Sequence, residues 1–325
     1  MSERDRENRR EGDRGPPWVW HEDYRAEIGP HVFPTVKYRK ARNRLVEEGV
    51  LREAGLERPE PVEREALERV HEERYLRKIE ERSFTRHETL VLEVPLTDSF
   101  VRASRLCADG TTRAGRRALE EGVCLHLGGG FHHAFPDHGE GFCLLNDVAV
   151  AIRSLQAAGR VERASVVDCD VHQGNGTAAI FADDPDVFTF SIHQERNYPF
   201  EKPPSDVGVG LPDGIGDDDY LERLTERLPE AVAGHRPELV FYLAGADPYR
   251  EDQLGGLGLS RRGLRRRDET VLEACREAGV PVAVCLAGGY AVRLEDTVEI
   301  HCGTGRALAE SWRRRREGGG RRQEA

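Results

Sequence analysis

The chain has 325 residues, a formal net charge of −11 at neutral pH and seven cysteines with no Cys-x-x-Cys pair. The negative charge opposes binding to nucleic-acid phosphates, and the odd, scattered cysteines argue against a disulfide framework. No window approaches the roughly 20 apolar residues of a membrane helix, and residues 1–14 lack the apolar core of a signal peptide. We therefore expect a cytoplasmic protein with one large domain over residues 17–312, between disordered charged tails at 1–16 and 313–325.

Alternating apolar runs and amphipathic stretches indicate the fold class. In chain order, the apolar runs predict strands at 123–127, 164–168, 187–192, 239–244 and 281–287. Helices are predicted at 146–158, 218–232 and 261–278. This alternation is typical of an α/β domain with a parallel central sheet and helices on both faces. Because open α/β sheets bind ligands at the carboxyl ends of their strands, the residues after each strand are the candidates for a site.

The first such segment follows the strand at 123–127 and reads Gly128-Gly129-Gly130-Phe131-His132-His133. Its glycines form a flexible turn that delivers two adjacent histidines. Adjacent residues point in different directions, so His132 and His133 can serve two roles. Taken alone, the pair is equally compatible with the protein surface.

The strand at 164–168 ends in the most informative segment, Asp168-Cys169-Asp170-Val171-His172-Gln173-Gly174-Asn175-Gly176. Two carboxylates and an imidazole after a buried strand are costly unless a cation compensates their burial. Asp170 and His172 suit Zn²⁺ or a similar divalent metal, which for catalysis needs a further protein ligand and an open position for water. Alternatively, the two aspartates cap the helix that starts at the glycine turn, and His172 is a core histidine.

Two more strand ends complete the candidate site. Gly245-Ala246-Asp247 follows the strand at 239–244, and Asp247 is the predicted third metal ligand. Gly288-Gly289-Tyr290 follows the last strand, where the glycines let the backbone approach a ligand and Tyr290 offers a hydroxyl. Singly, an Asp after Gly is compatible with a turn and a Tyr after Gly-Gly with packing. Together, the four strand ends describe one site.

In this order, and with Gly141-Phe142-Cys143-Leu144-Leu145-Asn146-Asp147 between them, these motifs resemble the zinc-dependent histone deacetylase family. That family includes bacterial acetylpolyamine and acetoin-utilisation relatives. The resemblance runs from about His21 to about Gly305, and residues 31–38 look like the first active-site loop of the bacterial members. The segment at 170–176 and the short Gly-Gly-Tyr are most similar to the class IV branch and its bacterial relatives. The resemblance implies a single-domain arginase-deacetylase type of fold.

The resemblance also implies roles for the residues at the strand ends. The implied ligands of zinc, or of Fe²⁺ in its place, are Asp170, His172 and Asp247. His133 would be the general acid and base, and His132 would act electrostatically. Tyr290 would donate its hydroxyl to the oxyanion of the tetrahedral intermediate.

Two outer residues would orient the histidines by accepting from their far nitrogens, Asp168 for His132 and Asn175 for His133. Class I enzymes carry a second Asp at the position of Asn175. A neutral amide cannot raise the basicity of an imidazole as a carboxylate does, so the division of labour between the two histidines stays open.

The resemblance further implies a potassium site and an acyl channel. The implied potassium ligands are Asp168, Asp170, His172, Ser191 and the backbone of Ile192. Phe142 and Tyr198 would flank the channel, with Gly141 and Leu254 at its wall, and two aromatic faces would accept a lysine-like methylene chain. The plainer alternatives are that Ser191 and the aromatic residues belong to the core.

The sequence therefore predicts a deacylase that uses metal-activated water to hydrolyse an acyl amide, in the simplest case acetyl. Its substrate would be an acylated lysine side chain or an acylated polyamine, with no nucleic acid or membrane as partner. Two alternatives remain. One is an arginase-like ureohydrolase on the same fold, which needs a further acid where Asn175 stands. The other is a catalytically silent protein that binds acylated partners. Acyl-chain length, native metal and oligomeric state are not determined.

Overall fold

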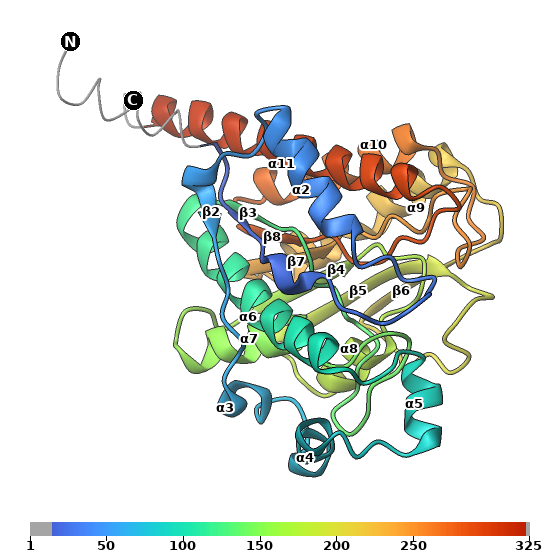
Figure 1. The fold of residues 1–325 in the computed structure, drawn as a ribbon. Helices are drawn as coiled ribbons and strands as arrows, with labels where there is room; N and C mark the ends of the chain where they lie inside the picture. The colour runs from blue at the N-terminus through green and yellow to red at the C-terminus, as the bar shows by residue number, and fades with distance from the viewer. Residues whose placement is uncertain (1–14, 323–325) are drawn as a thin grey trace.

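The computed structural model describes residues 15–322 and contains one eight-stranded sheet (Figure 1). Its strands are β1 (Trp18–Val19), β2 (Leu56–Glu57), β3 (Val123–His126), β4 (Ala164–Asp168), β5 (Val187–Gln194), β6 (Val207–Leu211), β7 (Leu239–Leu243) and β8 (Val282–Cys285). Every neighbouring pair is parallel, in the order β2-β1-β3-β8-β7-β4-β5-β6. The predicted parallel sheet is confirmed, and the five predicted strands correspond to β3, β4, β5, β7 and β8.

Helices cover both faces of this sheet, with α2, α10 and α11 on one side and α6 and α7 on the other (Figure 1). The α-helices are α2 (Lys37–Glu47), α3 (Arg64–Leu67), α4 (Glu73–Glu81), α5 (Arg86–Leu92), α6 (Asp98–Glu121), α7 (Asp147–Ala157), α8 (Asn175–Phe181), α9 (Asp217–Pro229), α10 (Arg261–Glu277) and α11 (Leu294–Arg322). Short helical turns lie at η1 (Glu22–Tyr24), η2 (Glu53–Gly55) and η3 (Glu230–Gly234). The three predicted helices correspond to α7, to α9 with η3, and to α10.

Capping residues in the sequence explain where several helices begin and end. Thr97, Asn146 and Ser260 each accept a hydrogen bond from a backbone N–H three residues further on, at the starts of α6, α7 and α10. Helix α6 ends at Gly122, whose φ of 84° is the left-handed conformation that glycine adopts readily. These local signals set the helix boundaries, and burial of one face holds each helix against the sheet.

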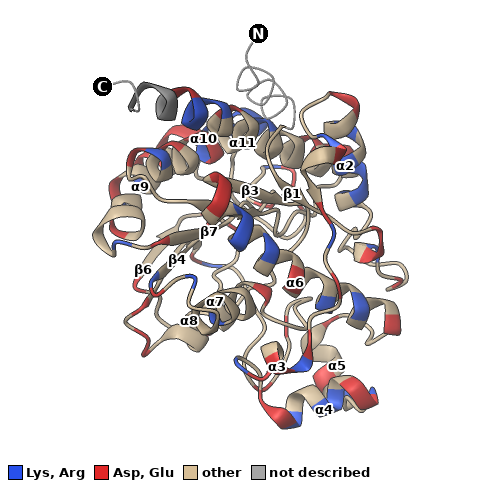
Figure 2. Ribbon diagram, turned by 90° about the vertical axis from the view of Figure 1, so that its left-hand side faces the viewer, with Lys and Arg blue, Asp and Glu red and all other residues tan. Residues whose placement is uncertain are grey.

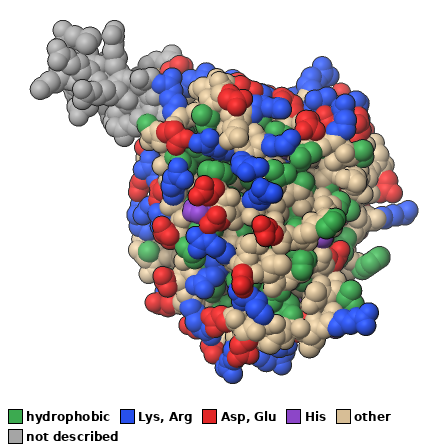
Figure 3. Space-filling model, viewed as in Figure 1, with side chains coloured by type: hydrophobic (Ala, Val, Ile, Leu, Met, Phe, Trp, Pro, Cys, Tyr) green, Lys and Arg blue, Asp and Glu red, His purple; other side chains and the backbone are tan. Residues whose placement is uncertain are grey.

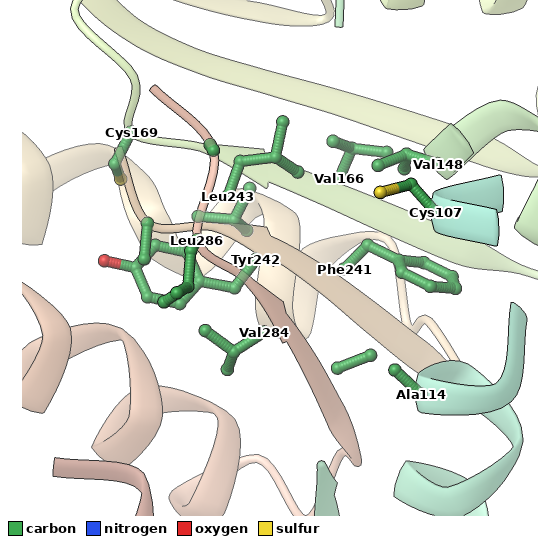
Figure 4. Close-up of a cluster of buried hydrophobic side chains, with 14 of the residues drawn as sticks. Cys107, Ala114, Val148, Val166, Cys169, Phe241, Tyr242, Leu243, Val284 and Leu286 are labelled. Carbon is green, nitrogen blue, oxygen red and sulfur yellow. The ribbon is translucent and has the colours of Figure 1, made fainter. Parts of the chain in front are cut away.

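The core lies on both sides of the central strands, which explains why their sequences are continuous apolar runs. In Figure 4, Phe241 and Leu243 of β7 lie on the same side of the sheet as Val166 of β4, whereas Tyr242 lies with Val284 of β8 on the other side. All five side chains are almost fully buried. Complete burial of a side chain of this size stabilises the fold by about 1.5–3 kcal/mol. This packing makes the sheet a rigid base for the loops at its carboxyl edge.

The outer parts of the structure differ from the sequence-based expectation. Strands β1 and β2 have only two residues each, and β6 has glycine at alternate positions, so none of them shows a long apolar run. Helix α11 continues to Arg322, through most of the predicted tail at 313–325. Trp312 is buried and Arg315 donates to the carbonyl of Val280 at 3.0 Å, which ties this helix to the domain. Of the predicted tail at 1–16, residues 1–14 lie outside the described residues, and Pro16 is buried.

The described surface carries both signs of charge side by side (Figures 2 and 3). Arg64, for example, forms ion pairs with Glu68, Glu73 and Glu80. Exposed pairs of this kind contribute only about 0–1 kcal/mol each. The seven cysteines are all buried and free, as expected for a chain without a disulfide framework. Within residues 15–322, none of the helices has the length and apolar character that crossing a bilayer requires.

Candidate metal centre

The strand order brings the four predicted motifs to one place. Strands β3, β8, β7 and β4 are consecutive in the sheet, and each is followed by one motif. Because the strands are parallel, all four motifs lie at the same edge. Residues from three of these motifs and from two nearby loops line one narrow cavity: Phe33, His132, His133, Phe142, Asp170, His172 and Tyr290.

Asp170, His172 and Asp247 form a buried cluster whose possible ligand atoms all lie within 4.8 Å of one another. The Nδ1 atom of His172 is 3.1 Å from Oδ1 of Asp170 and 3.8 Å from Oδ2 of Asp247. Oδ1 of Asp247 accepts from the N–H of Val171 at 3.0 Å, whereas Oδ2 is buried without a hydrogen-bond partner. An orphan carboxylate oxygen beside a second carboxylate is costly unless a cation binds there. Two carboxylates and one imidazole are a suitable donor set for Zn²⁺ or Fe²⁺.

The electrostatics of the two aspartates also fit a cation. Burial and the neighbouring charge of Asp170 raise the pKa of Asp247 well above its ordinary value. Burial opposes ionisation of Asp170 too, but His132 and His172 outweigh it and lower the pKa of Asp170. A bound cation would favour the ionised form of both carboxylates. A Cβ atom at Gly288 would overlap both of them, which explains the glycine at this position.

The tandem histidines form two unequal pairs. Nδ1 of His132 lies 2.6 Å from Oδ2 of Asp168, and Nδ1 of His133 lies 2.7 Å from Oδ1 of Asn175. The two Nε2 atoms are 3.1 Å apart. The structure thus places Asp168 and Asn175 against the histidines for which the resemblance implied them.

The histidines differ in protonation because their partners differ in charge. Burial lowers the pKa of His132, but Asp168 and Asp170 outweigh it and raise that pKa to about 9. Burial, together with the charges of His132 and His172, lowers the pKa of His133 well below its usual range. These opposite shifts favour a protonated His132 and a neutral His133. Only a neutral imidazole can accept a proton, so the geometry favours His133 as the base.

The alternative role for the aspartates, as caps of the helix that follows, does not match the structure. The N-cap of α8 is Gly174, which has no side-chain cap bond. Instead, Oδ1 of Asp168 accepts the N–H of Asp170, and Oδ1 of Asp170 accepts the N–H of His172, each at 3.0 Å. These bonds orient the carboxylates within their own loop.

Tyr290 lies over the same cavity and is held by its backbone. Its N–H donates to Oδ2 of Asp252 at 2.7 Å, and its carbonyl accepts from the side chain of Gln253 at 2.7 Å. The ring meets Phe33 and Phe142 edge-on, at centroid distances of 6.3 and 5.7 Å. This packing limits the positions that the hydroxyl can reach.

The predicted channel residues lie around the cavity in different ways. Gly141 has a φ of 52°, and a Cβ atom there would lie 2.8 Å from Cδ2 of His133 and 3.0 Å from Cε1 of Tyr198. The ring of Tyr198 meets His133 edge-on at 5.0 Å, and Phe142 lines the cavity directly. Neither Tyr198 nor Leu254 is among the residues that line the cavity. The carbonyl of Leu254 accepts from the side chain of Asn197 at 2.8 Å, so Leu254 supports the segment that carries Tyr198.

Comparison with known proteins places these residues in a family context. The chain matches the model of the histone deacetylase domain over residues 31–304. It belongs to the histone deacetylase family. It is 32% identical to "Histone deacetylase 2" of Arabidopsis thaliana over 269 residues, which cover 80% of this chain and 70% of that protein. It is 31% identical to the "Histone deacetylase-like amidohydrolase" of Pseudomonas aeruginosa over 283 residues, covering 82% and 73% of the two chains. An uncharacterized protein of Picosynechococcus is 42% identical over 288 residues, covering 88% and 96%.

A solved structure confirms the arginase-deacetylase type of fold. The crystal structure of the HDA15 HD domain superposes with a TM-score of 0.75 at 23% identity, covering 92% of this chain and 89% of that one. Membership in the histone deacetylase family supports a hydrolase of the deacetylase or amidohydrolase kind. It does not favour the ureohydrolase alternative. In agreement, the amide of Asn175 faces His133 and is not part of the metal cluster.

The potassium site implied by the histone deacetylase family stays a prediction. Ser191 on β5 is the register partner of Asp168 on β4, so the two residues are neighbours in the sheet. The hydroxyl of Ser191 lies 3.0 Å from Nδ1 of His193, and Ile192 is fully buried. The sheet register thus brings Ser191 next to Asp168, as a shared site would require.

Three residues at the site were not assigned a role from sequence. Lys37 is fully buried and donates from Nζ to the carbonyl of Ala287 at 2.8 Å, and burial lowers its pKa to about 8. Asp252 anchors the Tyr290 loop, and Glu140 accepts from Asn175. Glu140 and Asp252 lie in loops, where polar side chains are common, and Lys37 is the first residue of a helix, so their local sequence carries no signal that distinguishes them from surface residues.

Proposed function

We propose that the protein is a zinc-dependent deacylase that hydrolyses an acetyl amide on a lysine-like or polyamine amine, with Fe²⁺ as the alternative metal. The observation that carries this proposal is the buried Asp170–His172–Asp247 cluster, in which Oδ2 of Asp247 has no partner. Beside it lie His132, whose pKa is raised, His133, whose pKa is lowered, and the buried Tyr290. Acid–base hydrolysis at a metal needs this combination of groups.

The chemistry follows from these groups. Asp170, His172 and Asp247 would hold a divalent metal, which when bound would supply Lewis-acid activation of a water molecule and of the amide carbonyl. His133 accepts the proton of that water on Nε2 as the oxygen adds to the acyl carbon, and then gives it to the nitrogen as the C–N bond breaks. Tyr290 donates its hydroxyl to the oxyanion that develops on the acyl oxygen. His132, which is paired with Asp168, would stabilise the negative charge electrostatically. The products are a carboxylate and a free amine.

The shape of the cavity favours a small acyl group. The cavity between Tyr290, His133, Asp170 and His172 is narrow, and Phe33 and Phe142 form an aromatic wall along it. An acetyl group needs little space there, whereas a long acyl chain would require this wall to move. Acylated lysine and acylated polyamine both present a methylene chain, so both remain candidate substrates. Likeness to the class IV branch and a cytoplasmic location also stay predictions.

The test is a matched substrate panel for the zinc-loaded protein: an acetyl-lysine peptide, a long-chain acyl-lysine peptide and acetylated polyamines. We expect hydrolysis of one acetylated class, with loss of activity in His133→Ala and Tyr290→Phe. Stoichiometric zinc without hydrolysis of any substrate would refute the proposal and favour the silent binding protein. Activity that survives in both variants would show that other residues perform the chemistry.

A further inference from the structure

The neutral amide of Asn175 raises a problem that a carboxylate in its place would not. An asparagine side chain has an acceptor end and a donor end of nearly the same shape. If Oδ1 faces His133, Nδ1 of the histidine carries the proton and Nε2 is free to act as a base. If the amide is flipped, Nδ2 faces Nδ1, the proton moves to Nε2, and His133 can no longer accept one. The activity of His133 therefore depends on the direction of this amide.

Glu140 lies at the other end of the amide. Its Oε1 accepts from Nδ2 of Asn175 at 2.5 Å and from the hydroxyl of Tyr198 at 2.7 Å. Oε2 lies 3.4 Å from Nε2 of His138. An ionised carboxylate can only accept hydrogen bonds, so it requires the donor end of Asn175. The acceptor end then faces His133, where Oδ1 lies 2.7 Å from Nδ1.

Charge and backbone both keep Glu140 in this role. Burial raises the pKa of Glu140, but hydrogen bonds from His138, Asn175 and Tyr198 outweigh it and lower that pKa below its ordinary value. The side chain is only 16% exposed. Its carbonyl accepts the N–H of Cys143 at 2.9 Å, which closes the turn that carries Gly141 and Phe142. The carboxylate is thus ionised and held in place at neutral pH.

We propose that Glu140 is a positioning residue that sets the direction of the Asn175 amide and thereby keeps the proton of His133 on Nδ1. This inference rests on the proposed function and deepens it, because it explains how His133 serves as a base without a carboxylate partner of its own. A second ring nitrogen, Nε2 of His132, lies 3.1 Å from Nε2 of His133 and also affects where that proton sits. Loss of Glu140 alone should therefore weaken the preference without abolishing it.

The first test is a double-mutant cycle on the substrate found by the panel. The glutamine of Glu140→Gln can offer either a donor or an acceptor to Asn175, so the amide loses its fixed direction. We expect kcat to fall by about tenfold, which is at the lower end of the effect of residues that orient a site residue. KM should change little. Asn175→Asp places two carboxylates side by side and should also lose activity. Adding Glu140→Gln to Asn175→Asp should restore activity, because a carboxylate at 175 needs no orienting partner. Asp137→Asn, which removes the exposed acid on the other side of His138, is the matched control and should change kcat less than twofold.

The second test does not depend on activity. Nitrogen-15 spectra of the histidine side chains distinguish a proton on Nδ1 from one on Nε2, and they can be recorded on the metal-free protein. His133 should carry its proton on Nδ1 in the native chain and in the Asp137→Asn control, and should show a mixture in Glu140→Gln. An unchanged state in Glu140→Gln, or a loss of kcat on adding that substitution to Asn175→Asp, would overturn the inference. If no substrate is hydrolysed, the proposed function fails while the spectra still decide the role of Glu140.

Discussion

Replacing Asp247 by asparagine should have opposite effects on the metal-free and the metal-loaded protein. The ligand atoms of Asp170 and Asp247 lie within 4.8 Å, so two full charges repel by about 3.5 kcal/mol or more at an effective dielectric constant of about 20. Asparagine removes one charge, keeps an oxygen for the N–H of Val171 and can donate to Asp170. The metal-free variant should therefore be more stable than the native protein, by up to about 3 kcal/mol where both carboxylates would be ionised.

The pH dependence has a defined sign. Because the folded-state pKa of Asp247 is raised, the native fold binds this proton more tightly than the unfolded chain does. The stabilisation that this bound proton provides is complete below the pKa of Asp in the unfolded chain, about 4. It is lost as the pH rises toward the pKa of Asp247 in the folded protein. The advantage of Asp247→Asn in the metal-free protein should grow over the same range. With zinc, the native protein should become more stable than Asp247→Asn, because the native protein keeps all three metal ligands. Zinc at 1,000 times its Kd stabilises the protein that binds it by about 4 kcal/mol.

Urea unfolding at several pH values, with and without zinc, measures both effects. Asp252→Asn is the matched control, because Asp252 accepts backbone N–H groups of Leu254, Gly255 and Tyr290. It should destabilise the protein in both states. If Asp247→Asn instead destabilises the metal-free protein at every pH, or binds zinc as tightly as the native chain, the assignment of a cation to this cluster is wrong.

The remaining predictions concern the oxyanion donor, the channel wall and the support of the metal loops. Tyr290→Phe should lower kcat by about a hundredfold with zinc affinity unchanged, and an equal loss of zinc by elemental analysis would contradict a role in the transition state. Gly141→Ala should lower activity more than zinc content, because its Cβ would lie 2.8 Å from Cδ2 of His133; kinetics beside metal analysis tests this. Arg267→Met should lower the free energy of unfolding in urea by about 3–5 kcal/mol, because Arg267 and Asp268 form a fully buried ion pair at 2.8 Å. A decrease below about 1 kcal/mol would refute that reasoning.

Much of the candidate site could be predicted because its signals are local. Asp168, Asp170 and His172 follow one another at alternate positions at the end of an apolar run, and this spacing together with the other strand ends points to a cation. Glycines mark the positions where backbone and ligand atoms come close, as the overlap of a Cβ at Gly288 with Asp247 shows. The central strands could be predicted for a similar reason, since strands that are buried on both faces need continuous apolar sequence.

Outer elements and supporting residues could not be predicted in this way. A two-residue strand such as β1 leaves no periodic pattern, and the arginines near the chain end indicate a charged tail until the buried Trp312 shows that the helix packs on the domain. The partners of Glu140, at positions 175 and 198, are distant in sequence and are brought together only by the fold. Hydrogen bonds of this range have no counterpart in local spacing.

The sequence by itself determined which chemical groups stand at the end of each central strand, because those groups directly follow an apolar run in the chain. Only the tertiary structure decided that β3, β8, β7 and β4 are neighbours, so that four separate motifs meet at one edge. It also decided that Asn175 is held between His133 and Glu140. The physical reason is that a parallel sheet orders its strands by packing and crossover connections, whereas residue spacing records only what lies within a few positions along the chain.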